Sequence, residues 1–266
     1  LAEALLRVPD AETAIALTAD QLGRADFDGA ADSTLARLSS TAIAMSKKFL
    51  PESGGEAGLM AKLGAKTVVA ATLRAVQLLG HQFVLGETIQ SAMKTAAQAR
   101  KDTPSLTFSY DMLGEGARTA EDAQRYFHSY QQAIAAIASQ AQSDERNNDG
   151  ISIKLSALHP RYEDAQHQRV LAELVPRVWA LCEQAAQTRI NLTIDAEEVD
   201  RLELSLDVFN ALLARVAKQQ PQWTGFGLAL QAYQTRALEL IAHVAGVARH
   251  HGVRLMCRLV KGAYWD

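Results

Sequence analysis

Two different spacings of apolar residues divide the chain. Over residues 1–103 apolar side chains recur at every third or fourth position, which is the period of an amphipathic helix. From residue 104 onward, short apolar runs of the kind found in strands alternate with longer segments of helical period. The pattern predicts an all-helical N-terminal arm over residues 1–103 and an α/β domain over residues 104–266.

The arm is predicted to contain several helices separated by short polar breaks. Breaks rich in Pro, Gly or Asp occur at residues 8–10, 26–32 and 51–55. Residues 59–79 trace one apolar helical face, and Thr88 is placed to cap a helix over residues 89–100. Packing on the following domain is the simplest role for the arm. The alternative is a non-catalytic module that binds a partner through an exposed face on residues 59–79.

The second part of the chain repeats a strand and helix pattern five times. The strands are predicted to begin near Phe108, Ile151, Asn191, Gly225 and Arg254, with helices over residues 120–141, 166–187, 204–218 and 235–250. Regular alternation of this kind favours a parallel sheet. No run leads into a Gly-x-Gly-x-x-Gly loop, so an open dinucleotide-binding sheet is disfavoured. We expect a (β/α)₈ TIM-type barrel of which this chain carries five of the eight units.

One face of every apolar run carries polar or charged residues. Because successive strand residues point to opposite faces, each run can be divided into two sets. The sets that contain the polar positions are Ser109, Asp111, Leu113 and Glu115; Ser152, Lys154 and Ser156; Thr193, Asp195 and Glu197; Gly227, Ala229, Gln231 and Tyr233; and Arg254, Met256, Arg258 and Val260. In a barrel these side chains point inward near the C-terminal ends of the strands, where barrel enzymes place their sites.

Charges inside a barrel need partners. An unpaired buried charge costs several kcal/mol, so Lys154, Asp195 and Arg258 must contact one another, water or a ligand. A closed internal ion-pair network is one interpretation. A ligand site is the interpretation that we favour, because Gln231 and Tyr233 add polar groups that such a network does not require.

A metal site is the alternative to this ligand site. Asp195, Glu197, Glu198 and Asp200 form an acidic cluster to which His159 could add a ligand. Neighbouring residues of a strand face opposite ways, however, and Arg201 offers the cluster a salt-bridge partner, so we expect no metal. A metal-assisted barrel hydrolase that uses His159, Asp195 and Glu197 is the alternative enzyme class.

Composition narrows the kinds of partner and the compartment. The 266 residues contain 27 Lys and Arg against 30 Asp and Glu, a net charge of -3 that offers no broad attraction for nucleic acid or anionic membrane. The two cysteines, Cys182 and Cys257, are too few for a secreted disulfide framework. No apolar run approaches the length of a membrane span. We therefore expect a cytoplasmic protein with a small-molecule ligand and no nucleic-acid partner for this piece.

Five motifs give a more specific indication. In the same order, they resemble motifs of the proline dehydrogenase domain of the bacterial bifunctional flavoenzymes called proline utilization A. The motifs are FSYDMLGE at residues 108–115, ISIKLSALHPRY at 151–162, IDAEE at 194–198 with DRLE at 200–203, LQAYQ at 230–234 and RLVKGAYWD at 258–266. The resemblance is close over residues 81–266 and loose over the first 80.

The resemblance implies a function. It implies a (β/α)₈ barrel that holds FAD and oxidises L-proline to 1-pyrroline-5-carboxylate by hydride transfer to flavin N5. Electrons would then pass to the quinone pool through peripheral contact with the inner membrane. The resemblance also implies a homo-oligomer in the full-length protein, and NAD as a cofactor only of an aldehyde dehydrogenase domain that this chain lacks.

The resemblance also assigns residues. The implied flavin contacts are Gln231, Arg258, Lys261, Gly262, Ala263 and Tyr264. Lys154, Asp195 and Tyr264 are implied on the substrate side, with Tyr264 as a wall against the ring. Glu115 is similar to the acid that closes the site by pairing with an arginine of the last helix.

Parts of the family pattern are not found within residues 1–266. The arginine pair that binds the proline carboxylate would lie beyond Asp266, and the ribbon-helix-helix DNA-binding domain of some members is also missing. We therefore expect a piece of a larger protein. Five units leave a sheet with one unpaired edge, so we expect that they neither fold nor work alone.

Overall fold

The structure is a computed structural model that describes residues 84–112 and 114–262. The chain divides into two compact units, Leu1–Glu87 and Thr88–Asp266. Helix α5 (Ile89–Asp102), which we assigned to the arm, therefore groups with the second unit. The expectations for the arm before residue 84, including the apolar face at 59–79, lie outside the described residues. Within the described ranges no helix is long and apolar enough to cross a bilayer.

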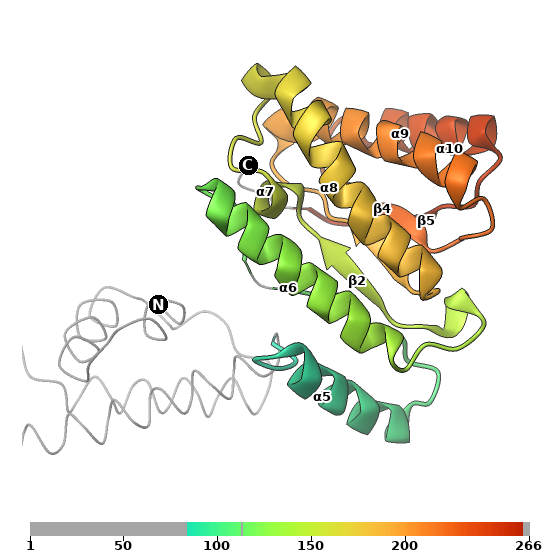
Figure 1. Ribbon diagram of the computed structural model, residues 1–266. Coiled ribbons are helices and arrows are strands. Elements are labelled where there is room, and N and C mark those ends of the chain that lie inside the picture. The colour runs from blue at the N-terminus through green and yellow to red at the C-terminus, as the bar shows by residue number, and fades with distance from the viewer. Residues whose placement is uncertain (1–83, 113, 263–266) are drawn as a thin grey trace, which may run out of the picture. The chain divides into compact units, whose positions relative to one another are not determined.

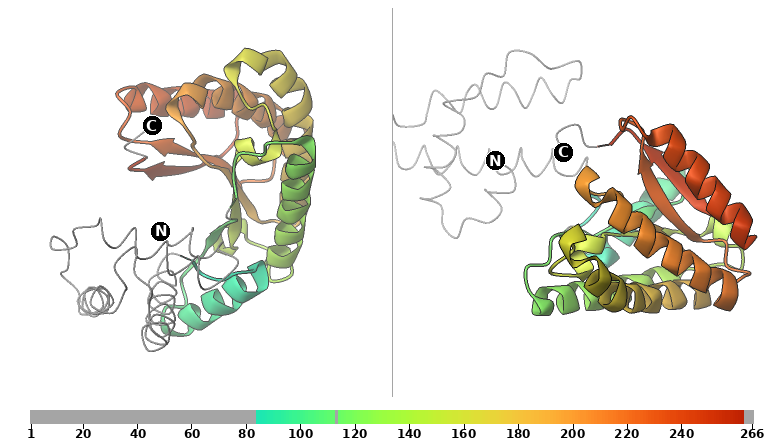
Figure 2. Two further views of the ribbon diagram at one scale, coloured as in Figure 1. Left: turned by 90° about the vertical axis from the view of Figure 1, so that its left-hand side faces the viewer. Right: turned by 90° about the horizontal axis from the view of Figure 1, so that it is seen from above.

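Five parallel strands form one sheet in sequence order (Figure 1). They are β1 (Ser109–Asp111), β2 (Gly150–Ile153), β3 (Asn191–Ile194), β4 (Phe226–Gln231) and β5 (Met256–Val260). All five begin within two residues of the predicted positions. Figure 2 shows the sheet curving, with the helices along its outer side. The predicted α/β class with a parallel sheet is confirmed.

Helices connect successive strands on that outer side. The long connections are α6 (Ala120–Ala138), α8 (His167–Gln187), α9 (Leu202–Gln219) and α10 (Ala237–His251). Short helical turns are η1 (Glu145–Asn147), α7 (Leu155–Leu158), η2 (Asp164–Gln166) and η3 (Val199–Arg201). The predicted cap of α5 is confirmed. The Thr88 hydroxyl accepts the Ser91 N–H at 3.2 Å, and the Ser91 hydroxyl accepts the Thr88 N–H at 3.0 Å.

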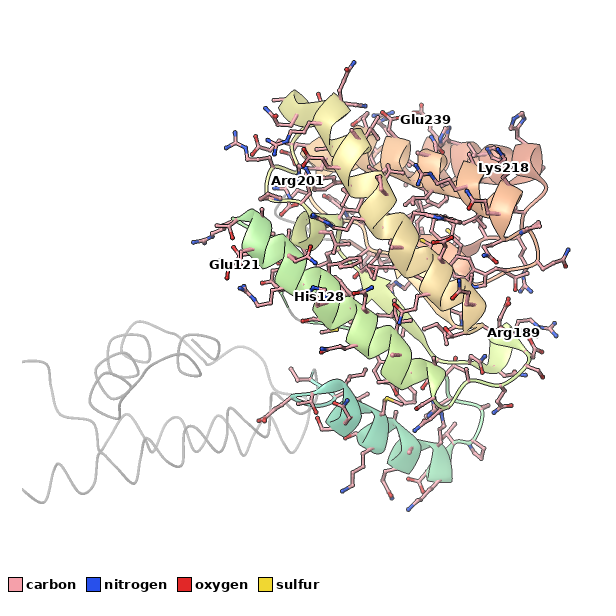
Figure 3. The ribbon with its side chains drawn as sticks, viewed as in Figure 1. Glu121, His128, Arg189, Arg201, Lys218 and Glu239 are labelled. Atoms are coloured by element: carbon pink, nitrogen blue, oxygen red, sulfur yellow. The ribbon has the colours of Figure 1, made fainter. Side chains whose placement is uncertain are left out.

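The core lies between the sheet and these helices. Ile134 of α6 and both Ile151 and Ile153 of β2 are fully buried. Phe209 of α9 stacks on Phe226 of β4 with ring centroids 5.5 Å apart. Charged side chains such as Glu121, Lys218 and Glu239 extend from the outer faces of the helices (Figure 3). The amphipathic helices thus cover one face of the sheet and leave the other face for polar groups.

We predicted that the alternation of strand faces continues beyond the residues at which the strands end, and this is wrong. Strand β2 ends at Ile153, and the short helix α7 begins directly after Lys154, so Ser156 and Ala157 do not lie on opposite strand faces. The backbone N–H of Lys154 donates to the Tyr130 hydroxyl of α6 at 3.1 Å instead of to a neighbouring strand. A period of two holds only while the sheet ladder continues. The same correction applies to Glu115, Glu197, Tyr233 and Arg254, which lie outside the strands to which we assigned them.

Candidate active site

A cavity of about 550 Å³ lies at the C-terminal ends of the five strands. This is the end of a parallel barrel sheet where active sites are found. The residues that line it are Asp111, Glu115, Ser152, Lys154, Asp195, Ala196, Glu197, Glu198, Ala229, Gln231, Arg258, Val260 and Gly262. Six of the predicted site residues are therefore brought together in one place: Glu115, Lys154, Asp195, Gln231, Arg258 and Gly262. Lys261 is not among the lining residues, and Ala263 and Tyr264 lie outside the described residues.

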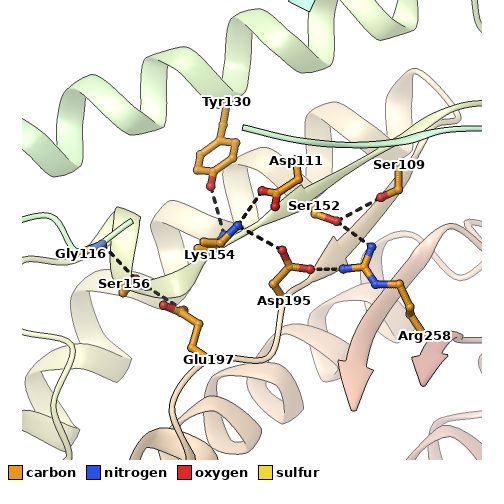
Figure 4. Close-up of polar contacts among 10 residues, drawn as sticks. All are labelled: Ser109, Asp111, Gly116, Tyr130, Ser152, Lys154, Ser156, Asp195, Glu197 and Arg258. Atoms are coloured by element: carbon orange, nitrogen blue, oxygen red, sulfur yellow. Dashed lines mark hydrogen bonds and ion pairs between the residues drawn. The ribbon is translucent and has the colours of Figure 1, made fainter. Parts of the chain in front are cut away.

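Lys154 is held between two carboxylates (Figure 4). Its ammonium nitrogen lies 2.6 Å from Oδ1 of Asp111 and 3.4 Å from Oδ2 of Asp195. Asp111 is the last residue of β1, Asp195 directly follows β3, and Lys154 directly follows β2 between them. The Lys154 side chain is 15% exposed and that of Asp195 is 12% exposed. Three adjacent strand ends therefore place one cation between two anions at the cavity wall.

Arg258 reaches this group from the far side of the sheet. Its guanidinium pairs with Asp195, and its Nη1 donates to the Ser152 hydroxyl at 3.0 Å. The Ser152 hydroxyl lies 3.0 Å from that of Ser109. Strands β2 and β5 are three positions apart, a separation of roughly 14 Å in a flat sheet, which an arginine side chain cannot span. The direct contact is possible because the sheet is curved and these side chains lie on its concave face.

Burial and charge act against each other at these groups. Burial raises the pKa of Asp195, while Arg258 and Lys154 oppose that shift. Burial disfavours the charged form of Lys154, but Asp111 and Asp195 outweigh it and raise the pKa of the amine. Burial also raises the pKa of Glu197, opposed by hydrogen bonds from Ser156. Lys154 is therefore a firmly protonated cation, and Asp195 is an acid whose ionised form depends on its two cations.

The ion-pair network that we set against a ligand site is present, and its members line the cavity. Within the five described units the side chains of Arg258 and Asp111 are 39% and 45% exposed. The arrangement presents two cations and two carboxylates to a space that a small molecule can enter.

A second set of hydrogen bonds joins the loops around the cavity. The Ser156 N–H donates to Oε1 of Glu197 at 3.0 Å, and the Gly116 N–H donates to the Ser156 hydroxyl at 3.1 Å. The Gln231 side-chain amide donates to the Glu197 carbonyl at 2.7 Å. Loops that follow β1, β2 and β3 are thereby linked to the end of β4.

Gly262 lies against the side chains of Tyr233 and Gln231. Its φ is +107°, and a Cβ at this position would lie 2.3 Å from the Tyr233 ring and 2.8 Å from Oε1 of Gln231. The Tyr233 N–H donates to the Lys261 carbonyl at 3.0 Å, which holds the segments after β4 and β5 together. Both the backbone conformation and the space therefore require glycine.

Sequence reasoning gave no role to Asp111 and Ser152, although it placed both on the polar faces of their strands. They are partners in the β1–β2 register, and each contacts one of the two cations. The sequence signal that could have identified Asp111 is an acid at the last position of a short strand. Its partner, Lys154, could not be chosen from sequence because that choice depends on the sheet register and the curvature.

The metal ligands that we considered do not come together. The buried His159 ring directs Nε2 toward Oε2 of Glu173 on α8, at 3.2 Å, and its Nδ1 accepts the Arg161 N–H at 3.2 Å. His159 does not line the cavity with Asp195 and Glu197. Across residues 84–112 and 114–262, no three His, Cys, Asp or Glu side chains are grouped to hold a metal. Helix α7 turns the chain away after Lys154, which carries His159 out of the site.

The protein is expected to become less stable as the pH falls, because His159 is buried in its neutral form. Burial lowers the pKa of His159, although Glu173 opposes the shift, and protonation of Nδ1 would displace the Arg161 N–H. The unfolded chain then binds the proton more readily, so His159 contributes stability above its unfolded pKa of about 6.5 and loses it as the pH falls. The thermal midpoint of the wild-type full-length protein should exceed that of His159→Gln at pH 7.5, with a smaller difference at pH 5.5. A constant difference would contradict this expectation, and His243→Gln, at an exposed position of α10, is the control.

Comparison with known families decides the relationship. Residues 92–266 match the model described as proline dehydrogenase, which is well over half of the chain. The chain belongs to the proline dehydrogenase family. Domains of this family are TIM-type barrels and are flavin-dependent, so the five curved units are part of the predicted barrel fold.

Two PutA relatives match the whole chain, and a shorter proline dehydrogenase matches part of it. The bifunctional protein PutA of Salmonella typhimurium is 43% identical over 278 residues, which is 100% of this chain and 21% of that protein. PutA of Rhizobium meliloti is 38% identical over 275 residues, covering 100% of this chain and 22% of that protein. Proline dehydrogenase 1 of Bacillus subtilis is 29% identical over 188 residues, or 71% of this chain and 53% of that protein. The chain thus spans about a fifth of the length of the PutA relatives.

Solved structures give the same relationship. The bifunctional proline utilization A protein of Bradyrhizobium japonicum matches all of this chain and 27% of its own, with a TM-score of 0.66 and 46% identity. Proline utilization A of Bdellovibrio bacteriovorus has a TM-score of 0.70 at 20% identity, with 97% of this chain and 30% of its own covered. The second match bears on the fold alone.

Residues 1–83 match a second model, described as the DNA-binding domain of proline dehydrogenase. This description speaks against our expectation that the chain has no nucleic-acid partner. The segment itself contains eight Lys and Arg and nine Asp and Glu, so it lacks the net basic charge typical of phosphate binding.

Proposed function

We propose that this chain supplies flavin and substrate contacts of a proline dehydrogenase, which oxidises L-proline to 1-pyrroline-5-carboxylate with FAD as the oxidant. The observation that carries the proposal is the grouping of Lys154, Arg258 and Asp195 in one cavity at the C-terminal strand ends. Family membership makes proline the substrate to test first. The residues present fit both a flavin and a small amino acid.

FAD, when bound, takes up two electrons from the ring carbon next to nitrogen and gains negative charge on its ring. Fixed cations that are already oriented before the reaction are suited to stabilise that charge. Arg258 and Lys154 are such cations, and each is already oriented by a carboxylate. Gly262 and Gln231 line the same cavity as these cations. We propose flavin contacts from Gln231, Arg258, Lys261, Gly262, Ala263 and Tyr264.

The substrate side is proposed to consist of Lys154, Asp195 and Tyr264. Oxidation requires the ring nitrogen of proline to be neutral, because a protonated amine does not release a hydride from the neighbouring carbon. Asp195 and Lys154 present a carboxylate and an ammonium whose charges depend on each other, which suits binding of a zwitterion. Glu115 lies on an exposed loop at the cavity edge and is proposed to close the site over the substrate.

The deciding experiment adds L-proline without oxygen to the purified full-length gene product. Bleaching of a bound flavin at its visible absorption bands, with formation of 1-pyrroline-5-carboxylate, is the expected result. L-Alanine, which has no ring, is the negative control. A colourless protein that takes up no FAD, or a yellow protein that proline does not bleach, would overturn the proposal.

The remaining partners are proposed on the strength of the family alone. We propose the quinone pool as electron acceptor, through peripheral contact of a cytoplasmic protein with the inner membrane, and a homo-oligomer at full length. NAD would serve a separate aldehyde dehydrogenase domain, in keeping with the description of the PutA relatives as bifunctional. The division that we expected, a helical arm over 1–103 and barrel units over 104–266, stays a proposal, with α5 grouped with the barrel units. Proline-dependent reduction of a short-chain quinone by the purified protein tests the acceptor.

A further inference from the structure

We infer that Ser156 is a positioning residue that fixes two acids of the cavity wall, Glu115 and Glu197. Ser156 does not line the cavity and is 4% exposed. It bonds to the backbone of the loop that carries Glu115 and to the side chain of Glu197. Its consequence for turnover rests on the proposed function, whereas its consequence for loop order does not.

The loop that carries Glu115 depends on Ser156 for its anchorage. Glu115 stands between two glycines with positive φ, +128° at Gly114 and +64° at Gly116, so its backbone path is one that other residues rarely adopt. The Gly116 N–H donates to the Ser156 hydroxyl at 3.1 Å, and the Ala117 N–H donates to the Ser156 carbonyl at 2.9 Å. Gly114 lies against the Tyr126 ring and Ala117 is buried, but a Cβ built on Gly116 meets no atom within 4 Å. At Gly116 itself the anchor is therefore the hydrogen bond to the Ser156 hydroxyl.

Ser156 also binds Glu197, which lines the cavity from the loop after β3. The Ser156 N–H donates to Oε1 of Glu197 at 3.0 Å, and the Glu197 carbonyl accepts the Gln231 amide at 2.7 Å. Ser156 thus connects the loops after β1 and β3, and through Glu197 it connects them to a proposed flavin contact (Figure 4). Its place at the start of α7 makes this possible, because the chain leaves the sheet at Lys154 and passes between the two loops.

Ser156→Ala isolates the hydroxyl. The variant keeps the bond from the Ser156 N–H to Glu197 and the bond to the Ser156 carbonyl. It removes the hydroxyl, so the Gly116 N–H loses its acceptor and the Glu197 carboxylate loses its second hydrogen bond from Ser156. Loss of one net hydrogen bond corresponds to about a fivefold rise in local opening, and the amides of residues 114–117 should exchange with solvent about fivefold faster. A loosened Glu115 should raise KM for proline by about threefold to tenfold and change kcat by less than about twofold.

The experiment compares hydrogen exchange and steady-state kinetics in the full-length, flavin-loaded protein. Ser205→Ala is the matched control, because the Ser205 hydroxyl donates to the Leu202 carbonyl at 2.7 Å and does not line the cavity. Faster exchange at residues 114–117 with a raised KM, in Ser156→Ala alone, is the expected result. Unchanged exchange would overturn the inference, and so would an unchanged KM in an active enzyme. If the wild type is not bleached by proline, the proposed function fails and the exchange measurement still decides whether Ser156 orders the loop.

Discussion

Replacing Arg258 by methionine is expected to lower kcat/KM for L-proline by about 10²- to 10³-fold, the range seen when one preorganised donor to a developing charge is removed. Arg258 presents its guanidinium to the cavity and is oriented by Asp195 and by Ser152. Its charge becomes most useful as the bound oxidant gains electrons, so most of the loss should appear in kcat. The measurement is the rate of flavin bleaching in a single anaerobic turnover.

Two further variants separate charge from geometry in this prediction. Arg258→Lys keeps the positive charge but loses the fork that bonds Asp195 and Ser152 together, so it should recover only part of the rate. Arg254→Met removes an exposed cation just before β5 that does not line the cavity, and it should turn over at the wild-type rate. Because Arg258 is more than a third exposed, the thermal midpoint of Arg258→Met should change by only a few degrees. Wild-type kinetics in Arg258→Met would remove this residue from the site.

The fold was predictable where local pattern decides structure. The starts of the five strands and the cap at Thr88 follow from apolar periodicity and from a side chain that can bond its own helix. The end of β2 was not predictable in this way. Ile151, Ile153, Leu155 and Ala157 continue the alternation in the sequence, but the Tyr130 hydroxyl takes the next backbone N–H and the chain turns into α7. A hydroxyl from a helix that lies twenty-four residues earlier leaves no local signal.

The charged residues that meet in the cavity were predictable in part, but their pairings were not. Lys154, Asp195 and Arg258 stood out because a strand seldom carries a charge without a partner. The partner of Lys154 turned out to be Asp111 at 2.6 Å as well as Asp195 at 3.4 Å. Arg258 contacts Ser152 across three strand spacings, which only a curved sheet permits. Sequence gives the charges, whereas register and curvature decide which of them meet.

Replacing Lys154 by methionine is expected to lower kcat/KM for L-proline by about 10²-fold, because it removes the second fixed cation of the cavity and leaves Asp111 and Asp195 facing each other. The methionine fills much of the same space, so the loss should reflect charge. Bleaching in single turnover measures the chemical step, and binding of a proline analogue that is not oxidised measures the ground state. Turnover within about twofold of wild type would exclude Lys154 from the reaction.

The pH dependence distinguishes Lys154 from its neighbour. Lys154 lowers the pKa of Asp195 and Asp111 raises it, against the background of burial, which also raises it. Lys154→Met should therefore move the acid limb of kcat/KM to higher pH, since Asp195 then becomes protonated sooner as the pH falls. Asp111→Asn should move the same limb to lower pH while the ammonium stays charged. Shifts of opposite sign from two residues in direct contact would identify Asp195 as the acid that titrates, and shifts of the same sign would show that another group controls the limb.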